Sequence, residues 1–297
     1  MAAKQLSSSD YPQIEQSTWS KFSYKLEGVV NDAKIPFHDT KFNVAVQAAR
    51  AHIHFTDSVL PFSSATSILD IACGPGTVYS TLFSYSPIAL SPTASLLAND
   101  ISPSMIANLN NTKLAHPDSP TWSRVQASVE DATDLSLIPS ASQSHVLSAL
   151  GICNIPDSTA ALREARRVMA PGAVFSMTSI AKAAWMTDVM GVLTAMYPDR
   201  KVPFTGAQWR TKEAFKAELE RNGFVDVVVE EAGLSMGFTS PEDLVQTLWA
   251  VLPFMPGLVE GLNREDIPGI KDAQVRFVRK TYPDGAMPGL ALVSVAR

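Results

Sequence analysis

Two glycines, Gly74 and Gly76, follow a short apolar run in the segment ILDIACGPGT at residues 68–77. The apolar run 67–72 is typical of a buried strand, and the glycines predict a tight turn before a helix that begins near Thr77. Because glycine has no Cβ, the backbone of such a turn can pass close to a bound ligand. A strand, a glycine turn and a helix N-terminus in this order are typical of nucleotide-binding sites.

The spacing of this turn excludes two common phosphate-binding loops. A dinucleotide-binding turn has a third glycine that lets the helix pack closely on the strand, and Tyr79 occupies that position here. The Gly-Lys-Ser/Thr sequence of a P-loop does not occur. Asp70, at the end of the predicted strand, would repel phosphate groups and suit a cationic amino group. These features favour a nucleoside without a pyrophosphate, such as S-adenosylmethionine.

Carboxylates also follow the next two predicted strands. Asp100 comes after the apolar run 94–98, at a position where an acid can accept hydrogen bonds from both ribose hydroxyls. Ile101 is expected to pack on the adenine. The third run ends in Glu130-Asp131-Ala132, where a carboxylate could accept from the adenine amino group and a small alanine would leave room for the ring. The three strand ends together predict one nucleoside site.

Apolar runs that alternate with helical patterns predict an α/β fold with a doubly wound, mostly parallel sheet. Ligands of such sheets bind at the carboxyl ends of the strands, which agrees with the positions of the glycines and acids. The predicted strands are 67–72, 94–98, 122–129, 145–150, 173–180, 224–230 and 290–295, and predicted helices include 41–60, 157–169 and 212–222.

Two long stretches, 181–211 and 232–285, do not fit this minimal alternation. Long insertions after strand ends are typical of lids and binding loops. We therefore expect a lid over 181–211 and a helical substrate cap over 232–285. The remaining predicted parts are an N-terminal helical cap over 1–60, a cofactor-binding core over 61–180 that continues over 212–231, and a last core strand over 286–297.

The composition is that of an ordinary, mildly acidic globular protein. Of 297 residues 46% are hydrophobic and 18% charged, and the net charge of -5 without a basic run argues against a nucleic-acid partner. Cys73 and Cys153 lack the paired spacing of a metal site, so no metal is expected. Neither a signal peptide nor a membrane span is predicted, and we expect a cytoplasmic protein without a membrane partner. Whether it is a monomer or a homodimer stays open.

Four segments, taken in order, resemble the motifs of class I S-adenosylmethionine-dependent methyltransferases. They are 69–77 (LDIACGPGT), 99–102 (NDIS), 130–132 (EDA) and 162–172 (LREARRVMAPG), within a resemblance that covers about residues 65–180. Ala72 stands where the family often has glycine. The resemblance implies a seven-stranded, Rossmann-like sheet with the last strand antiparallel. It also implies S-adenosyl-L-methionine as cofactor and S-adenosyl-L-homocysteine as product.

The motifs imply which residues surround the ligands. Asp70, Gly74 and Gly76 would surround the methionine end, Asp100 the ribose, and Asp131 with Ala132 the adenine. An aromatic N-terminal flap would cover the cofactor, and aromatic and methionine side chains of the two insertions would line the substrate pocket. The predicted cofactor contacts are Asp70, Ala72, Gly74, Gly76, Asp100, Ile101, Glu130, Asp131, Ala132, Gly151 and Tyr24; the predicted substrate contacts are Trp19, Phe22, Asn154, Trp185, Met186, Met190, Trp249 and Phe254.

Methyl transfer from a sulfonium needs alignment and exclusion of water more than it needs a particular catalytic group. All five histidines precede residue 146, so a histidine base in the second half is absent. The stretch 150–156 (LGICNIP) lacks the Asn/Asp-Pro-Pro-Tyr/Phe tetrad of enzymes that methylate planar nitrogens. The catalytic residue stays unknown, with Asn154, Trp185 and His38 as candidates.

The chain layout resembles fungal small-molecule methyltransferases, including the gliotoxin-type dithiol S-methyltransferases. We therefore expect a transferase of secondary metabolism that methylates a small molecule, with a thiol favoured and oxygen or nitrogen possible. Two alternatives stay open, a methyltransferase-like regulatory protein that only binds the cofactor and a cyclase on the same fold that transfers no methyl group. A nicotinamide-dependent reductase is disfavoured by Tyr79.

Overall fold

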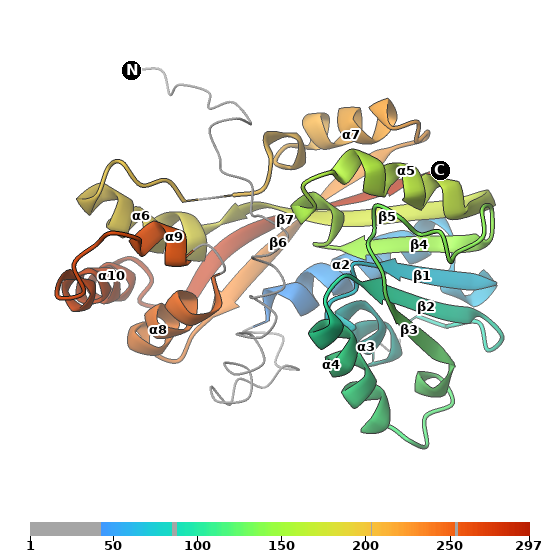
Figure 1. The fold of residues 1–297 in the computed structure, drawn as a ribbon, viewed down its shortest axis with the longest axis horizontal. Coiled ribbons are helices and arrows are strands. Elements are labelled where there is room, and N and C mark those ends of the chain that lie inside the picture. The colour runs from blue at the N-terminus through green and yellow to red at the C-terminus, as the bar shows by residue number, and fades with distance from the viewer. Residues whose placement is uncertain (1–42, 85–87, 203, 253–254) are drawn as a thin grey trace.

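The computed structural model describes residues 43–84, 88–202, 204–252 and 255–297. Within these ranges seven strands form one sheet in the order β3-β2-β1-β4-β5-β7-β6 (Figure 1). Strands β1 to β5 are parallel, whereas β7 runs antiparallel to both of its neighbours. The predicted fold class is thereby confirmed. The strands are β1 (Ser67–Ile71), β2 (Ser95–Asp100), β3 (Val125–Val129), β4 (Gln143–Ala149), β5 (Met169–Ala183), β6 (Val228–Gly237) and β7 (Ala286–Ala296).

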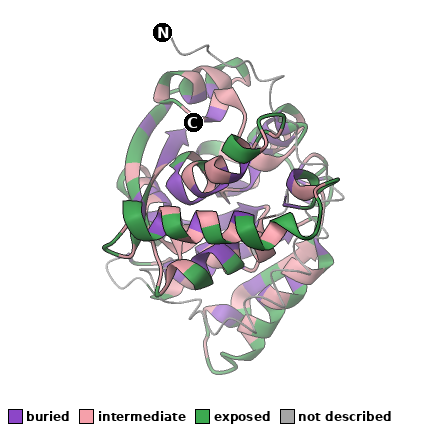
Figure 2. Ribbon diagram, turned by 90° about the vertical axis from the view of Figure 1, so that its left-hand side faces the viewer, coloured by how far each residue is buried: buried purple, intermediate pink, exposed green. Residues whose placement is uncertain are grey.

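Helices cover both faces of the sheet, as its alternating connections require. Buried side chains of α5 and α7 pack with Leu69 and Ile71 of β1, while those of α2, α3 and α4 pack with Ile68 on the opposite face. Figure 2 shows buried strands behind helices whose outward turns are exposed. The helices of these two layers are α2 (Val44–Val59), α3 (Thr77–Ser84), α4 (Pro103–Leu114), α5 (Ser158–Val168) and α7 (Lys212–Arg221).

Short polar side chains begin several of these helices. The hydroxyl of Ser102 accepts from the backbone N–H of Met105 at the start of α4. Helix α5 is capped by Asp157, whose carboxylate accepts from the N–H of Ala160 at 2.9 Å. The first turn of α4 thus lies directly after the carboxyl end of β2, whereas residues 150–157 separate α5 from the end of β4.

A second group of helices packs beside the sheet, at the left in Figure 1. Buried apolar residues of α6, α8 and α10 form one cluster with residues from β5, β6 and β7. None of the described helices has the length and apolarity that crossing a bilayer requires. The helices of this group are α6 (Ala184–Met196), α8 (Pro241–Val251), α9 (Met255–Val259) and α10 (Asp266–Thr281).

Several strand boundaries differ from those predicted. Strands β5 and β6 continue to Ala183 and Gly237 because both stay paired with β7 up to these residues, so residues 181–183 and 232–237 belong to the sheet. Strand β6 begins only at Val228, two residues after Asp226, whose positive φ of 52° interrupts extended backbone. Residues 122–124 form a short 3-10 helix before β3 instead of the start of that strand.

Candidate functional site

The carboxyl ends of β1 to β4 surround a cavity of about 310 Å³, a volume at the lower end of the range for small-molecule sites. Its wall comes from the ends of these strands, the loops that follow them, the first turns of α3 and α4, and one residue of α2, Ala45. Distant parts of the sequence therefore converge on one space. The predicted cofactor and substrate contacts that line it are Ala72, Gly74, Asp100, Ile101, Glu130, Asp131, Ala132, Gly151 and Asn154.

The two glycines of the turn after β1 have different roles. Gly74 has a φ of +55° and a Cβ there would meet no atom within 4 Å, so its backbone borders open space. Gly76 has a φ of +85°, and a Cβ there would lie 3.0 Å from Cγ of Leu109. The absent side chain of Gly76 thus lets the turn pack on α4. Gly76 does not line the cavity, contrary to the sequence prediction.

Asp100 holds the turn against the end of β2. Its Oδ2 accepts from the N–H of Gly74 at 2.8 Å and its Oδ1 from the N–H of Ser102 at 2.9 Å. Burial raises the pKa of Asp100, and the two backbone hydrogen bonds oppose this rise. A carboxylate oxygen has two lone pairs, so each oxygen can still accept a hydrogen bond from a ligand. Asp100 can thus hold the protein loop and a diol together.

Asp70 lies beneath the turn and not on the cavity wall. Its side chain is fully buried, and both carboxylate oxygens lack a hydrogen-bond partner among the described residues. Burial, and secondly the charge of Asp100, raise the pKa of Asp70 well above its usual value. Because β1 places this carboxylate inside the protein, a contact between Asp70 and a ligand's amino group, directly or through water, stays a prediction.

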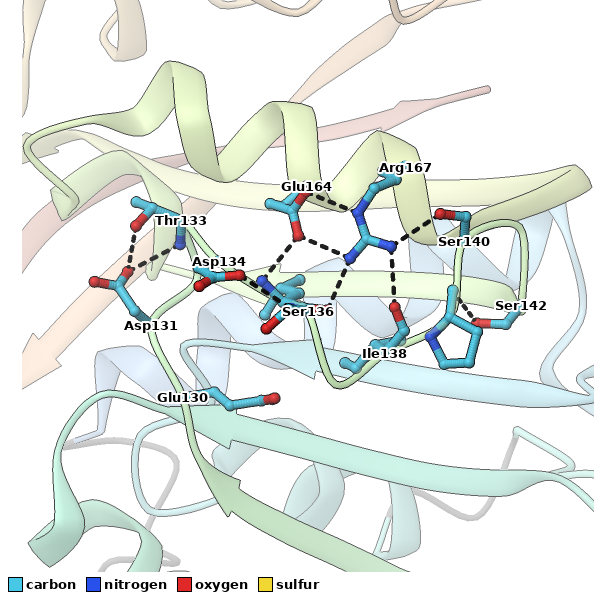
Figure 3. Close-up of polar contacts among 12 residues, drawn as sticks. Glu130, Asp131, Thr133, Asp134, Ser136, Ile138, Ser140, Ser142, Glu164 and Arg167 are labelled. Atoms are coloured by element: carbon cyan, nitrogen blue, oxygen red, sulfur yellow. Dashed lines mark hydrogen bonds and ion pairs between the residues drawn. The ribbon is translucent and has the colours of Figure 1, made fainter.

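The carboxylates after β3 point in opposite directions (Figure 3). Glu130 Oε2 accepts from Asn99 Nδ2 at 3.3 Å and Ser128 Oγ at 3.2 Å, while its buried Oε1 has no partner among the described residues. Asp131 Oδ1 accepts from the N–H and the hydroxyl of Thr133, at 2.9 and 2.8 Å. The unpaired oxygen of Glu130 is a buried acceptor beside the cavity.

Asn99 is a structural residue to which the sequence analysis assigned no role. Its Oδ1 accepts from the N–H of Ala72 at 3.3 Å, and its Nδ2 donates to Glu130. Asn99 thereby links the loops after β1 and β3 across the end of β2. Its place directly before Asp100 in the second motif is the signal that could have indicated this link.

The loop after β4 is held in a strained conformation. Leu150 has a φ of +57°, which is unfavourable for a bulky side chain. Its N–H donates to Oγ1 of Thr178 at 3.0 Å, and its carbonyl accepts from Nδ2 of Asn154 at 2.7 Å. A Cβ on Gly151 would lie 2.8 Å from Cβ of Ala72. Sequence reasoning missed Leu150 and Thr178, which fix this part of the cavity wall.

Four predicted substrate contacts do not line the cavity. Trp185 is buried with its ring against Gly289, where a Cβ would be 2.5 Å from the indole. Trp249 donates its Nε1 proton to Oε1 of Gln274 at 2.7 Å. Met186 and Met190 belong to the same apolar cluster of α6, α8 and α10. These side chains hold the helical group together. The predicted residues Trp19, Phe22, Tyr24, His38 and Phe254 lie outside the described residues.

Tyr79, which stands at the position of the third glycine of a dinucleotide-binding turn, has a structural role. Its buried hydroxyl donates to the carbonyl oxygens of Ile68 and Leu97, at 3.0 and 2.7 Å. The ring therefore fills the space between α3 and the first two strands. A glycine at this position would instead let the helix pack directly on the strands.

The two cysteines are buried, and neither is poised to react. Cys73 borders the cavity, but burial and then the charge of Asp70 raise the pKa of its thiol well above the usual value. Burial raises the pKa of Cys153 to about 12. Both thiols are consequently protonated at neutral pH. Within the described ranges, no group of three or more histidine, cysteine and acidic side chains is placed to hold a metal ion.

Comparisons with known proteins identify the core of the chain. Residues 69–177 match a family model described as a methyltransferase domain. Methyltransferase ucsB of Acremonium sp. is 27% identical over 253 residues, which are 84% of this chain and 87% of that protein. Methyltransferase tpcH of Aspergillus fumigatus is 30% identical over 164 residues, 53% of this chain and 56% of that protein.

Solved structures share the fold at low sequence identity. The [4+2]-cyclase SpnF superposes with a TM-score of 0.55 and 16% identity over 97% of this chain and 98% of its own. The YcgJ protein from Bacillus subtilis gives a TM-score of 0.52 and 12% identity over 84% of this chain and 97% of its own. These likenesses concern the fold alone.

Proposed function

Because the chain belongs to the class I S-adenosylmethionine-dependent methyltransferases, we propose that it methylates a small molecule of secondary metabolism, with a thiol as the preferred acceptor. The observation that carries this proposal is the convergence of Gly74, Asp100 and Asp131 on one cavity of about 310 Å³. The fungal relatives named above are methyltransferases, which supports the same reaction class.

The cavity wall has the groups that an adenosyl sulfonium needs. The open space over Gly74 admits a ligand against the backbone, and Asp100 would accept from the ribose hydroxyls. Asp131 would accept from the adenine amino group, with Ala132 beside the ring. Oε1 of Glu130 is buried and has no partner among the described residues, so it could accept a hydrogen bond from the ligand. When bound, S-adenosylmethionine supplies an electrophilic methyl group.

The chain's own contribution to the reaction is orientation and exclusion of water. Transfer requires the acceptor atom, the methyl carbon and the sulfur to lie in line, and holding them so lowers the entropic part of the barrier. The loop after β4, clamped at Leu150 by Thr178 and Asn154, would form a rigid wall beside the acceptor. Ala45 of α2 lines the cavity as well.

The side chains of this wall support the proposed preference for a thiol. From Leu150 to Pro156, the lining residues contribute apolar groups and the amide of Asn154, and none of these described side chains can take up a proton near neutral pH. A thiol with a pKa of about 8.5 is partly ionised without help, whereas a phenol or alcohol would want a positioned base. An acceptor that ionises by itself therefore suits this wall best.

The proposal is tested by product analysis. The purified protein is incubated with S-adenosylmethionine and a panel of dithiols, monothiols, phenols and amines, and mass spectrometry follows methylated acceptor together with S-adenosylhomocysteine. We expect methylated thiols. Tight cofactor binding with no methylated product in any class would favour the regulatory alternative. An isomerised product without an added methyl group would favour a cyclase, and SpnF, which shares this fold, is a [4+2]-cyclase.

The parts around the core have proposed roles too. The N-terminal cap over 1–60 and the insertions over 181–211 and 232–285 would cover the acceptor side of the cavity. Support comes from Ala48 of α2, which packs in the same apolar cluster as α6, α8 and α10, one turn from the cavity residue Ala45. A cytoplasmic location without nucleic-acid or membrane partners remains part of the proposal.

A further inference from the structure

The loop between β3 and β4 carries Asp131 but has little regular structure of its own. Residues 130–142 form turns and bends. Several of its backbone groups are bound by two side chains of α5, Glu164 and Arg167 (Figure 3). Both belong to the segment 162–172, which resembles a family motif and lies outside the proposed cofactor contacts. The structure gives this segment a role.

Arg167 uses all five of its guanidinium N–H groups, two with Glu164 of the same helix and three with this loop. Two parallel bonds of 2.8 Å join Nε and Nη2 to the carboxylate of Glu164. Nη2 also donates to the carbonyl of Leu135 at 2.7 Å, and Nη1 donates to the carbonyl of Ile138 and the hydroxyl of Ser140, both at 3.0 Å. Such bidentate, fully used geometry is specific to arginine.

Glu164 completes the arrangement from the other side. Its Oε2 accepts from the N–H of Leu135 at 2.8 Å, so the amide and the carbonyl of Leu135 are both bound to the ion pair. The pair is partly exposed, with side-chain exposures of 31% for Arg167 and 18% for Glu164. Partly exposed ion pairs stabilise a fold little by themselves. The significance of this pair lies in the backbone groups that it fixes.

A hydrogen-bonded turn joins Asp131 to Leu135, the residue whose backbone the ion pair binds. The N–H of Asp134 donates to the carbonyl of Asp131 at 2.9 Å, which closes a turn from Asp131 to Asp134, directly before Leu135. Oδ1 of Asp131 accepts from Thr133 within the same turn. The side chain of Leu135 is fully buried, so the turn cannot shift outward without exposing it. A displacement of Leu135 would therefore move Asp131.

We propose that the Glu164–Arg167 ion pair positions Asp131, across the turn 131–135, for recognition of the adenine amino group. The inference rests on the proposed function, in which Asp131 accepts from that amino group. Arg167 does not line the proposed cofactor cavity, so it would act there only through the backbone that it holds. Its loss should change which base the site prefers, and not merely how stable the protein is.

The test compares two ligands that differ at this edge of the base. S-inosylhomocysteine carries a carbonyl where S-adenosylhomocysteine carries the amino group, and its neighbouring ring nitrogen N1 bears a proton. A carboxylate placed at the amino group therefore attracts S-adenosylhomocysteine and repels the carbonyl of the inosyl compound. Calorimetric titration measures both dissociation constants for the wild type and for Arg167→Lys. We expect the wild type to prefer S-adenosylhomocysteine by roughly tenfold to a hundredfold, as hydrogen bonds to charged groups allow. In Arg167→Lys the ratio should fall several-fold, because lysine cannot reproduce the five contacts.

Arg124 provides a matched control. Its Nη1 donates to two backbone carbonyls, those of Ser91 and Ala94, both at 3.0 Å, and these lie at the amino end of β2, away from the cavity. Arg124→Lys loses comparable bonds and should keep the wild-type ratio. Melting temperatures of both variants record the loss of stability separately.

Three results would overturn the inference. If Arg167→Lys keeps the wild-type ratio of the two dissociation constants, Arg167 has no positioning role. If the ratio falls equally in Arg124→Lys, the effect is a general loosening of the protein. A wild type that binds S-adenosylhomocysteine without preferring it over the inosyl compound removes the contact between Asp131 and adenine, and the inference with it. A wild type that binds neither compound removes the proposed function itself, which is a different failure.

Discussion

Replacement of Asp100 by alanine is the most direct test of the cavity as a cofactor site. The substitution removes both carboxylate oxygens, which accept from the N–H groups of Gly74 and Ser102. It also removes the proposed acceptors of the two ribose hydroxyls. The fold should persist, because Asp100 is the last residue of β2 and its backbone pairing with β3 does not depend on the side chain.

The expected loss of affinity follows from these bonds. A hydrogen bond to a charged acceptor contributes about 1.5–3 kcal/mol, and loss of two of them, offset in part by water entering the gap, should weaken binding by about 3 kcal/mol. This corresponds to a roughly hundredfold higher dissociation constant. Some stability is lost as well, because two partly buried N–H groups lose their acceptor.

The assay is calorimetric titration of S-adenosylhomocysteine into the wild type and Asp100→Ala, with unfolding followed in parallel. Asp57→Ala is the matched control, because Oδ1 of Asp57 accepts from the N–H of Phe62 at 2.8 Å and Asp57 does not line the cavity. The control should lose stability and keep its affinity. A folded Asp100→Ala protein that binds within about threefold of the wild type would refute the assignment, since a lost hydrogen bond to a charged group predicts far more.

Three further substitutions test the packing and the buried charges around the site. Gly151→Ala places a Cβ 2.6 Å from Ser148 Oγ, and should lower the free energy of unfolding in urea by about 1–3 kcal/mol; an unchanged value would show that the loop yields freely. Asp70→Asn removes a carboxyl whose pKa burial raises in the folded state. Ionisation of that carboxyl disfavours folding, so wild-type stability falls as pH rises through the raised pKa, and the variant should lack this fall; parallel curves would contradict it. Burial lowers the pKa of His52 from 6.5 to about 4. The unfolded chain therefore takes up a proton first as pH falls from 6.5 to 4, which costs the wild type about 3 kcal/mol of stability. His52→Leu should lose stability less steeply over this range, and equal slopes measured by thermal unfolding would argue against a neutral buried imidazole.

The cofactor side of the site could be read from the sequence because its signals are local. The turn at Gly74 and the acids at Asp100 and Asp131 each directly follow a recognisable strand, and parallel topology brings the carboxyl ends of such strands together. Periodicity and turn residues therefore indicated the fold class and the strand ends that border the cavity.

Other features depended on contacts between residues far apart in the chain. Trp185 looked like a pocket residue by type, but its ring packs on Gly289 of β7. Asp70 looked like a ligand contact, yet β1 places its carboxylate inside the protein. Leu150 has its positive φ because Thr178 of β5 binds its N–H. In each case, residues distant in the sequence determine where the side chain lies or which conformation the backbone takes.

The sequence by itself therefore determined the order of strands and helices, the glycine turn and the acids at the strand ends, since short-range spacing and backbone preferences specify these. The tertiary structure alone decided which side chains face the cavity and which pack inside, and that Arg167 reaches the backbone of Leu135. The physical reason is that burial and hydrogen bonding join groups brought together only when the sheet and its helices assemble.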